Sequence, residues 1–278
     1  MASRFDSEVA VITGGANGIG EGIAEAVVAR GAAVALLDID SGRLAATAAR
    51  LRGEGATVLD IPVDVRDAAA LATAAERVQS ELGPVTMVCA NAGTGGRERP
   101  VWEVPLDEWR WVYDLNVFGA IATVQSFLPA MLEADGGHIV VTASMQGITT
   151  GRVGPYASSK HAVAAFAEVL RDDLARGGSR IRVSCLCPSF TKNSLLTDPD
   201  RGWEYRGEPL TPAERAARQD VVRRLAEYGV PAREVGEMVA DAVGTDRFWL
   251  LPDPASVERV QWRAAHIAAD ADRPRSDN

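Results

Sequence analysis

A chain of 278 residues with 47% hydrophobic and 24% charged side chains can bury a sizeable core, which excludes a wholly disordered protein. Its formal net charge of −9 argues against a nucleic-acid partner, because phosphate backbones are bound by clustered Lys and Arg. No apolar run reaches the roughly 18 residues of a membrane span, and the N-terminus lacks the apolar core of a signal peptide. We therefore expect a cytoplasmic protein with no membrane partner.

Short β-branched runs alternate with helical stretches along the chain. Strands are expected at 8–13, 32–38, 56–62, 85–91, 138–144, 180–187 and 247–252, and helices at 18–30, 41–53, 67–81, about 105–133, 155–177 and about 231–244. Strands buried on both faces read as continuous apolar runs, and the helices between them require parallel crossovers. The pattern predicts an α/β fold of one domain over 1–278, with a doubly wound parallel sheet of about seven strands.

A glycine-rich stretch, ITGGANGIGEGIA at 12–24, joins the first expected strand to the first helix. N–H groups at such a helix N-terminus face whatever lies there, with the positive end of the helix dipole behind them, which suits a diphosphate. The spacing Gly14-x-x-x-Gly18-x-Gly20 is not the usual G-x-G-x-x-G, and a tight strand-to-helix turn is the alternative.

The second expected strand ends at Asp38, 18 residues beyond Gly20. A carboxylate at this place accepts hydrogen bonds from both ribose hydroxyls of an adenosine and repels a 2′-phosphate. Neither Ala16, Asn17 nor Ile39 offers a basic group, so NAD is favoured over NADP as the cofactor. The alternative is that Asp38 caps the next helix, a role that Ser41 fills at least as well.

The cysteines and histidines indicate no metal and no disulfide framework. Three cysteines (Cys89, Cys185 and Cys187) are too few for a framework, which fits a reducing compartment, and the three histidines show no zinc-ligand spacing. The long irregular segment at about 189–211 resists regular structure, and loops of this length usually function as lids. We expect a substrate lid at about 189–228 and a frayed C-terminal tail.

Six motifs in register resemble the short-chain dehydrogenase/reductase family over residues 8 to about 190. They are Thr13-Gly14-x-x-x-Gly18-Ile19-Gly20, Asp64-Val65, Asn91-Ala92-Gly93, Asn116 in LNVFG, Ser144, and Tyr156-Ala-Ser-Ser-Lys160. The resemblance implies a Rossmann-type sheet, a nicotinamide cofactor, and a catalytic group of Asn116, Ser144, Tyr156 and Lys160. It also implies that Asn116 holds a water linking Lys160 to solvent.

The chemistry of these side chains agrees with the resemblance. Tyr156 and Lys160 are four residues apart on an expected helix and therefore share one face. A nearby ammonium and a positive nicotinamide ring favour the phenolate of Tyr156, which makes it the candidate general base for an alcohol or acid for a ketone. Ser144 follows a neighbouring strand, where its hydroxyl can hold the substrate oxygen. The alternative for Tyr156 and Lys160 is an ordinary exposed helix pair.

The resemblance implies further cofactor contacts at the carboxyl ends of the strands. Asp64 and Val65 would hold the adenine, and Asn91, Ala92 and Gly93 would let the cofactor lie close over the fourth strand. The complete expected cofactor set is Gly14, Asn17, Gly18, Ile19, Gly20, Asp38, Asp64, Val65, Asn91, Ala92, Gly93, Tyr156, Lys160, Pro188 and Thr191. A simple strand-end turn is the alternative for the residues after the third and fourth strands.

The chain departs from the family pattern after the sixth strand. Ser189 stands where the family usually has Gly, and Asn193 stands where it usually has Thr. The nicotinamide carboxamide is still expected to meet the backbone at Thr191 and the Asn193 amide. This departure puts cofactor affinity and ring orientation in question.

The expected substrate is a small molecule, a medium-sized and partly hydrophobic secondary alcohol or ketone. By resemblance its neighbours are 94–97, 145–147, Val153, and the lid around Phe190, Trp203 and Tyr205, and an arginine among Arg97, Arg99 and Arg152 could bind a carboxylate. Two other functions stay open: an NAD-binding sensor or scaffold without turnover, and a sugar-nucleotide epimerase or dehydratase.

We expect a homo-oligomer, a tetramer or a dimer, because in relatives the two long helices form an interface with their copies. The sequence support is an apolar stripe at helical spacing: Val117, Ile121, Val124 and Leu128. The same stripe could instead face its own sheet.

Overall fold

A parallel sheet lies at the centre of the computed structural model, which describes residues 5, 7–192 and 210–271. Its seven strands follow the order β3-β2-β1-β4-β5-β6-β9, and every neighbouring pair is parallel. They are β1 (Val9–Thr13), β2 (Ala33–Asp38), β3 (Val58–Pro62), β4 (Met87–Ala90), β5 (His138–Thr142), β6 (Arg182–Leu186) and β9 (Trp249–Leu250). The predicted doubly wound α/β sheet is confirmed.

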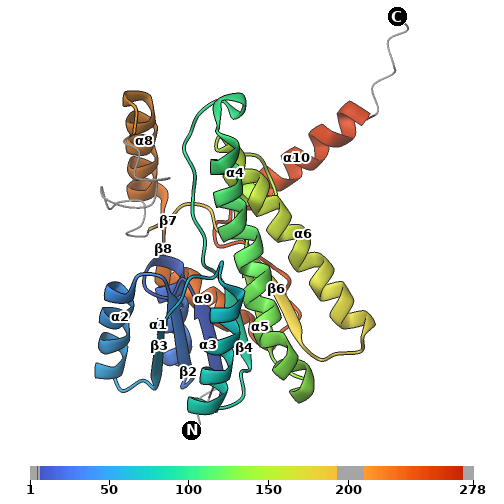
Figure 1. Ribbon diagram of the computed structural model, residues 1–278. Helices are drawn as coiled ribbons and strands as arrows, with labels where there is room; N and C mark the ends of the chain where they lie inside the picture. The colour runs from blue at the N-terminus through green and yellow to red at the C-terminus, as the bar shows by residue number, and fades with distance from the viewer. Residues whose placement is uncertain (1–4, 6, 193–209, 272–278) are drawn as a thin grey trace, which may run out of the picture.

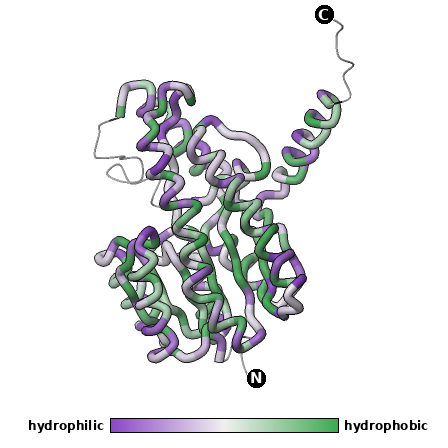
Figure 2. The backbone as a smooth tube through the Cα atoms, turned by 45° about the vertical axis from the view of Figure 1, so that its right-hand side comes forward, coloured by the Kyte–Doolittle hydropathy of each residue, from purple (hydrophilic) through white to green (hydrophobic). Residues whose placement is uncertain are grey.

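Helices cover both faces of the sheet (Figure 1). One face carries α3 (Ala68–Glu81), α5 (Gly119–Ala134) and α6 (Gly154–Arg176), and the other carries α1 (Gly18–Val28), α2 (Ser41–Gly53) and α9 (Ala232–Ala242). Alternate residues of β1 enter the two cores, Val9 and Val11 on one side and Ala10 and Ile12 on the other. Figure 2 shows that the hydrophobic residues are concentrated in the sheet and the helices that cover it. The strand order reverses between β1 and β4, the place where open α/β sheets bind ligands.

The long helix expected at about 105–133 has a break in it. A 3-10 turn (Val101–Glu103) precedes α4 (Leu106–Tyr113), and a π-helical turn (Asp114–Phe118) then leads into α5. In that turn the N–H of Gly119 donates to the carbonyl of Asp114, five residues earlier. The whole run Leu106–Ala134 is long and apolar enough to cross a membrane by length and composition, which is weak evidence because core helices pass the same test.

The apolar stripe that supported an oligomer faces the protein's own core. Val117 and Val124 are buried in the cluster beneath α5, and Ile121 and Leu128 pack against it half-buried. The stripe therefore offers no support for an interface between copies.

Two helices lie outside the regular alternation of strands and helices. The segment after β6 forms β7 (Thr191–Lys192), and the chain returns through α8 (Pro212–Tyr228) to β8 (Val230–Pro231), which pairs with β7. The final helix α10 (Ser256–Ala271) follows β9 and extends away from the body (Figure 1). The sequence analysis predicts neither α8 nor α10. Helix α10 begins just after Pro254, and its residues do follow a helical pattern.

Candidate active site

The glycine-rich loop is tightly folded at the carboxyl end of β1. Gly14 and Gly18 have φ of +66° and +58°, a region that glycine enters at no steric cost. A Cβ on Gly20 would lie 2.0 Å from the Gly14 carbonyl oxygen, so the first turn of α1 closes directly onto the loop. Asn17 is the N-cap of α1 with extended backbone, and Ile19 packs half-buried against the core. The first N–H groups of a helix have no partner within the helix, so those of α1 are suited to bind a diphosphate.

The carboxylate of Asp38 lies beside this loop. It accepts hydrogen bonds from the backbone N–H of Ala16 at 3.1 Å and from that of Asp40 at 2.9 Å. Asp38 does not cap α2, and neither does Ser41: the N-cap is Asp40, whose side chain accepts from the Arg43 N–H at 3.2 Å. The alternative role for Asp38 is therefore wrong, and its carboxylate is tied to the glycine loop instead.

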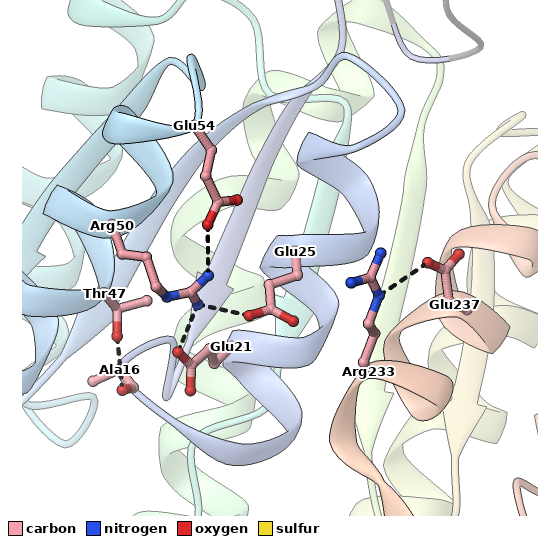
Figure 3. A network of polar contacts seen from close by, with 8 residues as sticks. All are labelled: Ala16, Glu21, Glu25, Thr47, Arg50, Glu54, Arg233 and Glu237. Atoms are coloured by element: carbon pink, nitrogen blue, oxygen red, sulfur yellow. Dashed lines mark hydrogen bonds and ion pairs between the residues drawn. The ribbon is translucent and has the colours of Figure 1, made fainter.

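Helix α2 supports the glycine loop from behind (Figure 3). The Thr47 hydroxyl donates to the Ala16 carbonyl at 3.1 Å. One turn later the Arg50 guanidinium contacts three carboxylates, Glu21 and Glu25 of α1 at 2.7 Å each and Glu54 at 3.2 Å (Figure 3). These contacts hold both the glycine-rich loop and α1 against α2, which restricts the movement of the loop.

Asn91 joins the carboxyl ends of three strands. Its side-chain amide donates to the Thr13 carbonyl at 3.1 Å, and its side-chain oxygen accepts from the Thr142 hydroxyl at 3.1 Å. The Thr13 hydroxyl in turn accepts from the backbone N–H groups of Asn91 and Ala92. A Cβ on Gly14 would lie 3.0 Å from the Ala92 Cα, so the loops after β1 and β4 are in contact. Asn91 and Ala92 therefore hold together the carboxyl ends of β1, β4 and β5.

Asp64 and Val65 lie at the carboxyl end of β3 with different surroundings. The Asp64 carboxylate forms a forked ion pair with Arg66, whose Nε is 2.9 Å from both oxygens. These hydrogen bonds from Arg66 lower the pKa of Asp64, against an opposing effect of burial. Val65 is buried against α5, where a Cβ on Gly119 would lie 2.7 Å from its side chain. The position of both residues fits an adenine site, although Arg66 already engages the carboxylate.

Ser144, Tyr156 and Lys160 come together at the carboxyl end of β5. Ser144 is the N-cap of a 3-10 turn (Met145–Gly147), and its hydroxyl oxygen accepts from the Gln146 N–H at 3.1 Å. Tyr156 is hydrogen-bonded to Ser144 and lies half-buried in the first turn of α6. The Lys160 ammonium lies 5.9 Å from the centre of the Tyr156 ring and donates to the Thr142 carbonyl at 2.8 Å. The expected catalytic side chains thus form one cluster.

Burial dominates the acid–base properties of this cluster. It lowers the pKa of Lys160 to about 8. It also raises the pKa of Tyr156 above its ordinary value, while the hydrogen bond with Ser144 acts in the opposite direction. The sequence predicts that the ammonium and a positive nicotinamide ring together favour the phenolate, whereas without the nicotinamide burial keeps the pKa of Tyr156 raised on balance.

Asn116 lies buried in the π-helical turn and its side chain makes three hydrogen bonds. Its oxygen accepts from the Thr94 N–H at 2.8 Å, and its amide donates to the Thr94 carbonyl and the Ser159 hydroxyl, both at 3.0 Å. A Cβ on Gly93 would lie 3.1 Å from the Asn116 oxygen and 3.3 Å from the Lys160 nitrogen. The Asn116 side chain thus clamps the loop after β4 to α6.

The segment after β6 closes the other side of the cluster. The Pro188 carbonyl accepts from the Met145 N–H at 3.0 Å, next to Ser144. Thr191 is buried in β7, and the Ser189 hydroxyl accepts from Arg259 of α10 at 3.1 Å. Asn193, Trp203 and Tyr205 lie outside the described residues.

The arginines on the substrate side already have partners. Arg99 forms an ion pair with Glu214 of α8, and Arg152 forms an exposed pair with Glu98 at 3.2 Å. Arg97 is buried, with its backbone N–H donating to Glu108. Met145, Gly147 and Val153, also expected near the substrate, are all buried. A substrate carboxylate would have to compete with Glu214 or Glu98 for Arg99 or Arg152.

Within residues 5, 7–192 and 210–271, no group of three or more His, Cys, Asp or Glu side chains could hold a metal ion. The three cysteines are free and buried, and the sulfur atoms of Cys185 and Cys187 lie 3.7 Å apart as a hydrogen-bonded pair.

Comparisons with known proteins identify the family to which this fold belongs. The family described as "short chain dehydrogenase" matches residues 8–204. A solved short-chain dehydrogenase/reductase from Burkholderia phymatum, in complex with NAD, is 32% identical and superimposes with a TM-score of 0.90 over 99% of this chain and 98% of its own.

Two curated relatives extend the comparison to named activities. The chain is 35% identical to 1-deoxy-11-beta-hydroxypentalenate dehydrogenase from Streptomyces arenae over 92% of this chain and 86% of that protein. It is also 35% identical to 2-dehydro-3-deoxy-L-rhamnonate dehydrogenase (NAD(+)) from a Sphingomonas species, over 70% of this chain and 77% of that protein.

The fold and the site together define a Rossmann-type oxidoreductase with a nucleotide cofactor. The chain belongs to the short-chain dehydrogenase/reductase family. It is a dehydrogenase of that family, acting on alcohol or ketone substrates.

Proposed function

We propose that this single-domain protein transfers a hydride between NAD(H) and a medium-sized, partly hydrophobic secondary alcohol or ketone. The arrangement of Ser144, Tyr156 and Lys160 carries the proposal, because it places a hydroxyl donor, a proton carrier and a buried ammonium in one cluster. The buried, apolar Met145 and Val153 beside Ser144 support a substrate with hydrophobic surface.

The carboxylate of Asp38 supports NAD as the cofactor. It already accepts the Ala16 N–H at the glycine loop and has further lone pairs for ribose hydroxyls. Its negative charge would repel a 2′-phosphate. Gly14, Gly18 and Gly20 would hold the diphosphate, and the close contact between Gly20 and Gly14 fits such a cradle.

The chemical step follows from the positions of the side chains. A nicotinamide held beside these residues would supply the hydride acceptor or donor, and its positive oxidised ring would favour a neighbouring phenolate. The Ser144 hydroxyl donates to the substrate oxygen and holds it beside Tyr156. The Tyr156 hydroxyl takes the proton from an alcohol or gives it to a ketone. Lys160, held by the Thr142 carbonyl, keeps a positive charge close to the tyrosine below pH 8.

The other functions left open by the sequence fit less well. A sensor or scaffold without turnover has no use for the Ser144–Tyr156 hydrogen bond beside a buried lysine. An epimerase or dehydratase shares Tyr and Lys, but both curated relatives described above carry the name dehydrogenase.

The direct test incubates the purified protein with NAD and a panel of secondary alcohols while the absorbance of reduced cofactor is followed. The panel pairs neutral apolar alcohols with carboxylated ones of similar size. Turnover on a neutral alcohol supports the proposal; absence of turnover across the panel with NAD and NADP contradicts it.

We also propose a cytoplasmic homo-oligomer, a tetramer or a dimer. Exposed apolar side chains on the outer faces of the long helices support it, with Phe118 58% and Val169 57% exposed. A solution mass of one chain, 29.5 kDa, would contradict it.

A further inference from the structure

Helix α8 belongs to a segment that leaves the body and returns to it at neighbouring points. Thr191 pairs with Val230 and Lys192 with Pro231, and the Val230 N–H donates to the Phe190 carbonyl at 2.9 Å. Among the seventeen residues of α8, only Glu214 and Leu225 are buried. Figure 1 shows α8 standing apart from the sheet body. Its position therefore depends on a small number of contacts.

One of these contacts is an ion pair with Arg99, from the loop between β4 and α4. The Nε and Nη2 atoms of Arg99 donate to the same Glu214 oxygen, at 3.1 and 2.5 Å. The Glu214 side chain is 6% exposed and that of Arg99 is 21% exposed. An ion pair with so little access to water is weakened less by solvent than a surface pair.

The second oxygen of Glu214 fixes the carboxylate within α8. It accepts from the Thr211 N–H at 2.7 Å, and the Thr211 hydroxyl accepts from the Glu214 N–H at 3.2 Å, which completes a capping box. Burial acts to raise the pKa of Glu214, but the hydrogen bonds from Thr211 and Arg99 outweigh it and lower the pKa. The first turn of α8 and the ion pair therefore form one rigid unit.

The loop that carries Arg99 is tied to the reaction centre. Its Thr94 is clamped by Asn116, and its Gly93 lies against Lys160. A Cβ on Gly96 would lie 2.9 Å from the Val153 side chain, just before α6 begins. Arg99 therefore links α8 to a loop that contacts the catalytic cluster.

We propose that Arg99 and Glu214 are positioning residues that hold α8 beside the substrate side of the reaction centre. Substrate binds productively only when α8 is in place, so the apparent affinity falls with the fraction of molecules in which it is. The kinetic part of this proposal rests on the proposed function. Cofactor binding at the glycine loop and the proton transfer at Tyr156 are independent of the pair.

The main experiment compares Arg99→Met with a matched control, Arg30→Met. Arg30, just after α1, pairs with Glu237 and Asp241 of α9 at 2.6 and 2.8 Å, and its side chain is 20% exposed against 21% for Arg99. Arg99→Met should raise KM for the alcohol roughly tenfold, with kcat and the Kd of NADH within about twofold of wild type. Arg30→Met should leave KM unchanged.

Two further variants separate the ion pair from the helix cap. Glu214→Gln keeps an acceptor for the Thr211 N–H but removes the charge, and should reproduce the rise in KM. Arg99→Lys keeps the charge and should restore part of the affinity. Combining Arg99→Met with Glu214→Gln should add little to either change alone, since both remove the same contact.

Hydrogen exchange gives a readout that needs no turnover. The backbone amide hydrogens of residues 213–228 should exchange faster in Arg99→Met than in wild type, whereas in Arg30→Met they should exchange at the wild-type rate. Unchanged exchange in Arg99→Met, or an unchanged KM, overturns the proposal. If wild type oxidises no alcohol in the panel, the proposed function fails while the exchange comparison still decides the role of the pair.

Discussion

Gly22 of α1 and Gly236 of α9 meet where the two helices cross. A Cβ on Gly22 would lie 2.2 Å from the Ala232 carbonyl oxygen, and a Cβ on Gly236 would lie 2.0 Å from the Gly22 carbonyl oxygen. Both distances are far below van der Waals contact, and backbone atoms cannot move aside as a flexible side chain can. The crossing therefore requires glycine on both helices.

We expect Gly236→Ala to destabilise the protein by about 1–3 kcal/mol or more, because the added methyl group forces α9 away from α1. The measurement is the free energy of urea unfolding. Gly53→Ala is the control: Gly53 is also helical, but no atom lies within 4 Å of its added Cβ. That variant should be neutral or stabilising by up to about 1 kcal/mol. Equal effects of the two substitutions would refute the packing interpretation.

This crossing also shows where sequence reasoning about the glycine-rich stretch was incomplete. Gly14, Gly18 and Gly20 shape the loop, but Gly22, in the same stretch, serves the contact with α9 more than 200 residues later. The spacing of glycines along the sequence indicates where turns occur and where helices begin. It carries no information on which distant helix packs against a given glycine.

The residues of the catalytic cluster could be named from the sequence. Tyr156 and Lys160 are one helical turn apart. Ser144 follows β5, a strand whose carboxyl end lies beside those of β4 and β6. Spacing alone is equally compatible with an ordinary exposed helix pair, and it was the resemblance of six motifs in register that singled out these three side chains. The Arg99–Glu214 pair joins residues 115 apart through an irregular segment, so no pattern in the sequence reports it.

Asp38→Ser should narrow the preference for NAD over NADP. The substitution removes the charge that would repel a 2′-phosphate and the acceptor for ribose hydroxyls, which should cost roughly 1.5–3 kcal/mol of NAD binding. The measurement is kcat/KM with each cofactor. Asp60→Ser, at the middle of the neighbouring strand β3, is the control and should leave the ratio unchanged. Equal efficiency of wild type with both cofactors would contradict the role of Asp38.

His138 makes the stability of the sheet depend on pH. Its Nδ1 accepts from the Gly244 N–H at 3.2 Å, so its Nε2–H donates to the Ser184 hydroxyl at 2.8 Å, and that hydroxyl donates to the Arg247 carbonyl. A proton on Nδ1 would face the Gly244 N–H. Burial, aided by Arg182, lowers the pKa of His138 from 6.5 to about 4.

The unfolded chain therefore binds a proton at His138 that the folded protein rejects between pH 6.5 and about 4. Stability is undiminished above pH 6.5 and falls as the pH drops through this window, by up to about 3 kcal/mol from this group. Urea unfolding at pH 7.5, 6.0 and 5.0 should show the decline in wild type. His138→Asn, less stable at pH 7.5, should show a shallower decline, and an identical slope in both proteins would exclude His138 as its source.

Tyr156→Phe removes the hydroxyl that we propose moves the proton and leaves the ring in place. Turnover should fall at least about a hundredfold, because general acid–base groups contribute about 10²–10⁴ in rate. Ser144 lacks a suitable pKa, and Lys160 donates to the Thr142 carbonyl instead of reaching toward the substrate. The Kd of NADH and the melting temperature should stay near wild type. Tyr113→Phe, at a half-buried tyrosine of α4, is the control and should retain full turnover. If Tyr156→Phe keeps near-normal turnover on an alcohol that wild type oxidises, another group moves the proton and the catalytic assignment of Tyr156 is wrong.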